Sequence, residues 1–156
     1  MSDDAGHSPS VTIRISNHLE SPVDVSRLES IAIKTAEAEG AFGEISISIV
    51  DVDAMADLNE EFMGEVGPTD VLSFPVDGLV REGRKGNQVP VVIGEVVLCP
   101  EVAQRQAPGD PKGELDLLVA HGVLHLLGFD HDTETSAAQM REREQRSTGR
   151  SGARAS

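Results

Sequence analysis

The stretch HGVLHLLGFDH, from His121 to His131, holds three of the five histidines in the chain. Four residues of α-helix turn through about 400°, so His121 and His125 project from the same face and can bind one ion together. A continuous helix would carry His131 roughly 9 Å past His125 and about 240° round the axis. Glycine readily adopts the left-handed conformation that ends a helix. The stretch therefore predicts a helix that stops near Gly128 and a chain that folds back to bring His131 to the other two.

Three converging imidazoles indicate a metal site. Lone histidines in helices are usually core or surface residues, but three in eleven positions of a Leu/Val-rich segment favour ligands, because unpaired polar groups are costly to bury. Catalytic zinc typically has three protein ligands and a fourth position open to water. We therefore predict one Zn²⁺ per chain at the end of this helix, bound by His121, His125 and His131.

The same spacing occurs in the H-E-x-x-H-x-x-G-x-x-H pattern of metalloproteases, in which the glutamate is the general base. Gly122 stands at that position here, so peptide hydrolysis by the usual route is disfavoured. Two other classes stay open. One is a metalloprotease that lacks the glutamate base, and the other is a non-catalytic protein with a purely structural zinc, for which Asp130 or Asp132 could be the fourth ligand.

Length and composition limit the possible classes of protein. A chain of 156 residues with 38% hydrophobic and 26% charged residues is typical of one soluble globular domain. No apolar run approaches the roughly 20 residues that span a bilayer, and the first ten residues lack the features of a signal peptide. Cys99 is the only cysteine and is expected to be a small buried residue at a strand end. We therefore predict a cytoplasmic protein without a membrane partner.

The formal charge of −14 argues against a nucleic-acid partner, because phosphate binding depends on Lys and Arg. Positive residues nevertheless cluster at Arg81, Arg84 and Lys85, and again from Arg141 onward, and a bound cation would add local charge. Each cluster is either an ordinary solvated surface or a contact for phosphate, and the sequence leaves both open.

Hydrophobic periodicity predicts an α/β (α+β) fold, with one mixed four-stranded sheet covered by helices in a single small domain over 11–146. Residues 1–10 and 147–156 are predicted to be a disordered lead and a disordered tail. Strands are expected over 11–15, 45–49, 70–74 and 91–98, and a long loop over 76–90. Helices are expected over 24–39, with Asp24 or Ser26 as the cap, and over 53–62 and 100–107. Two more are expected from the Asp110 cap to Gly128 and from Thr133 or Asp132 to Gln145.

Two side-chain placements follow from these patterns. Asp53 is expected to cap the second helix, which would direct Met55, Leu58 and Phe62 to the core. In the histidine helix, leucines and Val119 are expected to face the core while His121 and His125 look outward into a cleft. Gly94 predicts a bulge or a close approach of backbone within its strand.

Three segments together resemble the YbeY family of bacterial rRNA maturation factors. HGVLHLLGFDH is similar to the family signature H-G-x-L-H-L-x-G-[YF]-D-H. The segment from Leu58 to Pro75 resembles a family segment that ends in P-T-[DN]-V-L-S-F-P, and GEVVLCPEVA from Gly94 to Ala103 resembles its G-D-I-x-[IL] strand and the helix that follows. The three matches occur in the right order and cover most of residues 11–146.

The resemblance implies a zinc-dependent, single-strand-specific endoribonuclease with the three histidines as ligands. It also implies a role in trimming 16S rRNA ends and in ribosome quality control, with RNA and the ribosome or ribosomal proteins as partners. With this resemblance, the non-catalytic alternative becomes a zinc-binding ribosome-assembly protein. Two positions depart from the family pattern. Met63 stands near the place of an arginine thought to meet RNA, and Glu95 replaces an aspartate.

Further site candidates follow from position. Asp130 could orient a ligand histidine and, with Glu95, is a candidate catalytic residue beside metal-activated water. Asp70 and Ser73 lie on a strand beside the expected cleft and are candidates for substrate contact, as are Arg81, Arg84 and Lys85 in place of the missing arginine. The sequence does not decide whether water or the ribose 2′-hydroxyl is the nucleophile.

Overall fold

The computed structural model describes residues 10–76, 91–129 and 133–149. Their four strands form one sheet in the order β1-β2-β4-β3. β1, β2 and β4 are parallel, whereas β3 lies antiparallel to β4 at the edge. The strand bounds are β1 Val11–Asn17, β2 Gly43–Ile49, β3 Val71–Pro75 and β4 Val92–Leu98. The predicted small domain with a mixed four-stranded sheet is confirmed.

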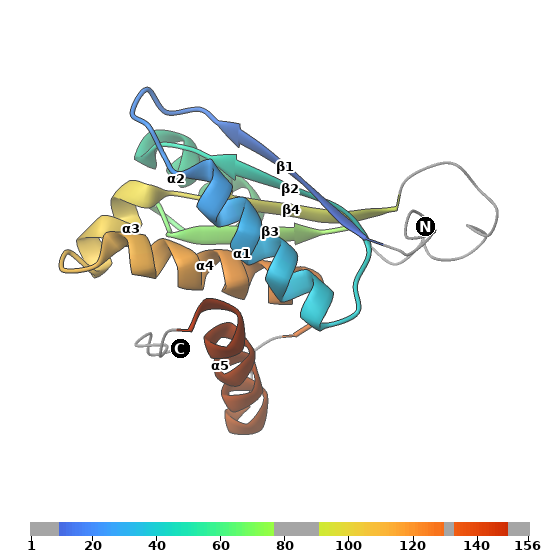
Figure 1. Ribbon diagram of the computed structural model, residues 1–156. Helices are drawn as coiled ribbons and strands as arrows, with labels where there is room; N and C mark the ends of the chain where they lie inside the picture. The colour runs from blue at the N-terminus through green and yellow to red at the C-terminus, as the bar shows by residue number, and fades with distance from the viewer. Residues whose placement is uncertain (1–9, 77–90, 130–132, 150–156) are drawn as a thin grey trace.

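The helices lie in layers on both faces of this sheet. Their bounds are α1 Val25–Ala38, α2 Val52–Met63, α3 Pro100–Gln106, α4 Pro111–Leu126 and α5 Glu134–Thr148. α1 and α4 cover one face, α5 packs on the outside of α4, and α2 lies on the opposite face (Figure 1). α4 is therefore enclosed between the sheet and α5. None of the helices in the described ranges meets the requirements of length and hydrophobicity for a transmembrane span.

The alternation in β2 determines the two faces of the sheet. Ile45, Ile47 and Ile49 are fully buried in the main core against α1 and α4. Ser46 and Ser48 alternate with them and therefore point to the α2 face. A smaller core on that face holds Met55, Leu72, Val97 and Cys99. The sheet thus has one continuous apolar face and one face on which apolar and polar side chains mix.

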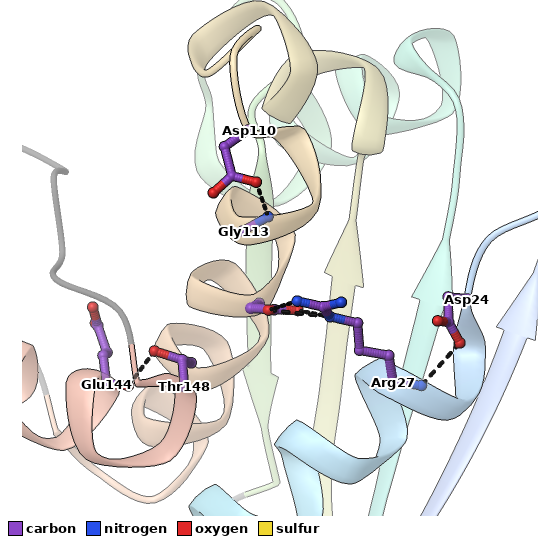
Figure 2. Close-up of polar contacts among 7 residues, drawn as sticks. Asp24, Arg27, Asp110, Gly113, Glu144 and Thr148 are labelled. Atoms are coloured by element: carbon purple, nitrogen blue, oxygen red, sulfur yellow. Dashed lines mark hydrogen bonds and ion pairs between the residues drawn. The ribbon is translucent and has the colours of Figure 1, made fainter.

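The predicted helix caps largely agree with the structure. Asp24 accepts a hydrogen bond from the backbone N–H of Arg27, and Asp110 accepts one from Gly113, directly before Pro111 at the start of α4 (Figure 2). Thr133 begins α5 with a capping box that it forms with Ser136. α4 ends at Leu126, and Gly128 has a φ of +102°, in the left-handed region that only glycine adopts easily. The predicted exit from the histidine helix is confirmed.

Three expectations are corrected. α2 is capped by Asp51, whose side chain accepts from Ala54 N–H, and Asp53 lies within the first turn. Phe62 is 55% exposed and does not reach the core, because the buried face of α2 is formed by Met55 and Asn59. α5 continues to Thr148, so the tail expected from 147 begins with helical residues.

Two predictions about β4 are confirmed. A register shift against β2 marks a bulge next to Gly94, and a Cβ at Gly94 would lie 2.6 Å from the carbonyl oxygen of Phe74 and 2.8 Å from Leu126. Cys99 is fully buried directly after the strand, and burial raises the pKa of its thiol. The thiol is therefore neutral at physiological pH and unreactive, as a structural cysteine should be.

An ion pair fixes α1 to α4. The Arg27 guanidinium reaches across to α4 (Figure 2), donating from Nε and Nη2 to the Asp116 carboxylate at 3.0 and 2.7 Å. Asp116 is 2% exposed and Arg27 38% exposed. These hydrogen bonds raise the pKa of Arg27. The Asp116 carboxylate therefore stabilises the charged form of the guanidinium.

Replacing Arg27 with alanine is expected to lower the free energy of unfolding by about 2 kcal/mol. Removing one partner of a buried pair costs about 3–5 kcal/mol, and the exposure of Arg27 reduces that figure. Urea denaturation measures the change. Arg105→Ala, which breaks an exposed pair with Glu101, is the matched control and should cost less than about 0.5 kcal/mol. Equal losses in the two variants would contradict the structural role of Arg27.

Candidate metal centre

α4 brings His121 and His125 together on one side of the helix, as predicted. Their ring centroids are 4.7 Å apart and the rings meet edge to face at 74°. Both residues lie in the last two turns of a helix whose residues are buried on nearly all sides. Two imidazoles are thus held close together by backbone that has little freedom to move.

His121 does not look outward into a cleft, and that expectation was wrong. It is 7% exposed, because α5 crosses over α4 at this point. Its Nδ1 lies 2.6 Å from Oε2 of Glu144 on α5, and Glu144 is itself only 3% exposed. His125, one turn further along α4, is half-buried. The histidine pair therefore has one enclosed member and one that is open to its surroundings.

The contact with Glu144 determines which nitrogen of His121 can bind a metal. A carboxylate can only accept hydrogen bonds, so Nδ1 of His121 carries the proton and donates it to Glu144. In the neutral ring Nε2 then keeps the lone pair that coordinates a metal. Metal-ligating histidines typically have such a partner on the other nitrogen. The environment of His121 is therefore that of a ligand histidine.

Sequence reasoning missed Glu144; the carboxylate that it proposed to orient a ligand histidine was Asp130, which lies outside the described residues. A signal was present, because Met140, Glu144 and Ser147 follow helical spacing and form the buried face of α5. A glutamate on the apolar face of an amphipathic helix needs a partner. Its partner is 23 residues earlier in the chain, and no local pattern identifies it.

Gly122 is the residue through which α4 touches the sheet. A Cβ at this position would lie 2.8 Å from Val96 Cγ1 and 3.3 Å from Ser73 Oγ. Ser73 Oγ also donates to the Gly122 carbonyl oxygen at 3.0 Å. A glutamate after the first histidine has no room in this packing. The hydroxyl of Ser73, a candidate for substrate contact, anchors β3 to the histidine helix.

The other described candidates have different surroundings. Glu95 points to the α2 face of the sheet, because its neighbour Val96 contacts Gly122 on the α4 face. Asp70 is buried just before β3, where its carbonyl oxygen accepts from Cys99 N–H. Met63 ends α2 and is 48% exposed beside the exposed Phe62. Met63, near the place where the resemblance implies an arginine, is therefore an exposed apolar side chain.

Several predicted site residues lie outside the described residues: His131, Asp130, Asp132, Arg81, Arg84 and Lys85. Within 10–76, 91–129 and 133–149, no three His, Cys, Asp or Glu side chains are grouped so that they could hold a metal ion.

Two arginines of the C-terminal basic cluster form ion pairs within the protein. Arg143 pairs with Glu39 and lies 4.7 Å over the Phe129 ring. Arg146 pairs with Glu142.

Comparison with known proteins identifies the relatives of this chain. The family model described as "Endoribonuclease YbeY" matches residues 14–152. This chain belongs to the YbeY family. Proteins named Endoribonuclease YbeY from Thermobifida fusca and Beutenbergia cavernae are 45% and 47% identical over 127 and 129 residues. These alignments cover 78% of this chain in both cases, and 81% and 85% of the two relatives.

A solved structure agrees with the family assignment at the level of fold. The solution structure of TM1509 from Thermotoga maritima superposes with a TM-score of 0.58 at 26% sequence identity, covering 88% of this chain and 90% of that one. Membership of the YbeY family supports an RNA endonuclease role for this chain, with RNA as the substrate class.

Proposed function

We propose that this chain is a zinc-dependent endoribonuclease that cuts single-stranded RNA during maturation of 16S rRNA and in ribosome quality control. The observation that carries the metal part of the proposal is the pairing of His121 and His125 on α4, with Glu144 holding the first ring through Nδ1. The nuclease part rests on the family match. The protein would act in the cytoplasm with the ribosome as a partner.

The donor set fits zinc. Two neutral imidazoles one turn apart suit a borderline-soft cation, and a carboxylate behind one of them makes that ring a better donor. His131, the third donor in the signature, would complete a set of three neutral ligands. When bound, zinc supplies positive charge that acidifies water and polarises a phosphoryl oxygen.

The chain's own residues have separate tasks. Glu144 holds the proton on Nδ1 of His121, so that Nε2 is presented as a lone-pair donor. Gly122 allows α4 to pack tightly on Val96, and Ser73 fixes that packing by its hydrogen bond to Gly122. α5 covers His121, which is only 7% exposed. The nucleophile is either water or the ribose 2′-hydroxyl, and Asp130 is the proposed carboxylate beside it.

The packing of Gly122 also disfavours the metalloprotease alternative. Peptide hydrolysis by the usual route needs a glutamate directly after the first histidine. A side chain there would meet β4 at 2.8 Å. A general base for peptide hydrolysis would therefore have to come from elsewhere in the chain.

Metal removal tests the proposal. We expect a chelator to abolish cleavage of a single-stranded 16S rRNA fragment and stoichiometric Zn²⁺ to restore it, with metal content measured by mass spectrometry. A duplex of the same sequence and casein are the controls, and both should remain intact. Cleavage that persists in zinc-free protein would refute metal dependence. Zinc bound at one per chain without any cleavage would favour a structural metal in a ribosome-assembly protein.

A further inference from the structure

A pocket of about 310 Å³ opens on the face of the sheet opposite the histidines. It lies where α2 leaves the polar part of the sheet uncovered. β2 and β4 form its floor with Ser48 and Glu95, while Phe62 of α2 and Phe74 of β3 form a wall. Its volume is near the lower limit for ligand pockets, which suits one small flat group. None of the roles derived above for the metal centre uses this pocket.

The wall of the pocket is aromatic and accessible. The Phe62 and Phe74 rings meet edge to face at 70° with centroids 5.3 Å apart. The chain has only four phenylalanines and neither tryptophan nor tyrosine, so half of its aromatic residues gather at this place. Phe62 is 55% exposed, which leaves ring surface available to a ligand. Single-stranded RNA is typically bound by stacking of bases on such rings.

The floor of the pocket carries a carboxylate with acceptor capacity left. Ser48 Oγ donates a hydrogen bond to Oε2 of Glu95 at 2.7 Å. Within the described ranges, this bond occupies one acceptor position of the Glu95 carboxylate. An ionised carboxylate can accept about four hydrogen bonds. A ligand that stacks on Phe62 and reaches Glu95 should therefore present N–H donors at its edge. His18 lies at the rim of the same pocket.

These requirements distinguish among the four bases. Cytosine, adenine and guanine each present an exocyclic amino group, which a carboxylate accepts from. Uracil presents one N–H between two carbonyl oxygens, and those oxygens repel a carboxylate. The pocket should accordingly accept an amino-bearing base and reject uracil.

The pocket and the histidines are connected by the edge strand β3. Ser73 contacts Gly122 on the α4 face, and the next residue, Phe74, lies in the pocket on the other face. β3 ends the sheet, with no strand beyond it among the described residues. A single RNA strand can therefore pass round this edge. One of its bases would then lie in the pocket, and the phosphodiester bond to be cut, a few nucleotides away, would lie near α4.

We propose that the pocket between α2 and the sheet binds one amino-bearing nucleobase of the RNA substrate and so contributes to the sequence preference of cleavage. The proposal rests on the proposed ribonuclease function for its ligand. Binding can nevertheless be measured without cleavage, using zinc-free protein and 2′-O-methyl oligonucleotides. The probes are single-stranded pentamers of C, A, G or U.

For the wild-type chain, we expect the C, A and G pentamers to bind about tenfold or more tightly than the U pentamer. Phe62→Ala should weaken binding of the amino-bearing pentamers about tenfold. Phe42→Ala is the matched control, because Phe42 is also exposed, at 45%, and does not line the pocket. It should leave every affinity unchanged.

Glu95→Gln provides a readout that a merely structural role would not change. Its amide can both donate and accept, so binding of the U pentamer should strengthen and the preference should fall to about twofold or less. A wild-type chain without base preference, or a Glu95→Gln variant that keeps it, would overturn the proposal. An arginine-rich peptide that occupies the pocket while no pentamer binds would overturn it too, in favour of a protein partner.

Failure of this proposal can be separated from failure of the proposed function. If cleavage depends on zinc but neither Phe62→Ala nor Glu95→Gln changes binding, the base-pocket proposal is wrong and the nuclease proposal stands. If the protein prefers the amino-bearing pentamers but cleaves no RNA, the base-pocket proposal is supported and the nuclease proposal is wrong.

Discussion

His125→Ala is expected to bring zinc content close to zero and to lower RNA cleavage by roughly 1,000-fold or more. A bound metal contributes several kcal/mol of charge stabilisation to a phosphoryl transition state, and each 1.36 kcal/mol is tenfold in rate. His125 is the better position to test, because it is half-buried whereas His121 is enclosed with Glu144. Metal analysis and single-turnover cleavage of a single-stranded rRNA fragment give the two readouts.

The fold of this variant should persist, so that the loss can be assigned to the site. We expect the urea midpoint of zinc-free His125→Ala to lie close to that of the zinc-free parent. His7→Ala, a histidine outside the signature, is the matched control and should retain zinc and activity. A His125→Ala protein that keeps both its zinc and its cleavage rate would remove the central assignment.

Glu144→Ala should weaken zinc binding by about 10–100-fold, because partners of ligand histidines typically contribute that much. Without the carboxylate, His121 loses the partner that holds the proton on Nδ1 and so directs Nε2 towards a metal. Competition with a chromophoric chelator measures the affinity. At limiting zinc, the cleavage rate of Glu144→Ala should fall together with its zinc affinity, and it should recover when the zinc concentration is raised. Added zinc would not restore cleavage if Glu144 were a catalytic base.

Two further variants separate orientation from packing. Glu144→Gln keeps the volume and an oxygen that accepts from Nδ1, so it should recover most of the zinc affinity. Glu142→Ala, on the same helix, removes a glutamate whose side chain is 71% exposed, and should bind zinc like the parent. If Glu144→Ala and Glu142→Ala have the same zinc affinity, Glu144 has no positioning role.

Local patterns were sufficient for most of the fold. The alternation of isoleucine and serine from Ile45 to Ile49 predicts a strand with one apolar face, and that face is buried. Asp24, Asp110 and Thr133 mark helix starts because a side-chain oxygen near the first turn satisfies free N–H groups. Errors arose where two adjacent residues had the same chemistry, as with Asp51 and Asp53, or where a helix extended beyond its apolar core, as with Phe62.

The sequence by itself determined the pairing of His121 and His125, since helical spacing alone puts residues i and i+4 on one face. It also determined the end of that helix, because Gly128 adopts a φ that other residues avoid. Only the tertiary structure decided what surrounds the pair. The packing of α5 on α4 buries His121 against Glu144, and the sheet separates Glu95 from both histidines. Such contacts join residues far apart in the chain, and their geometry depends on how whole elements pack, which no local periodicity encodes.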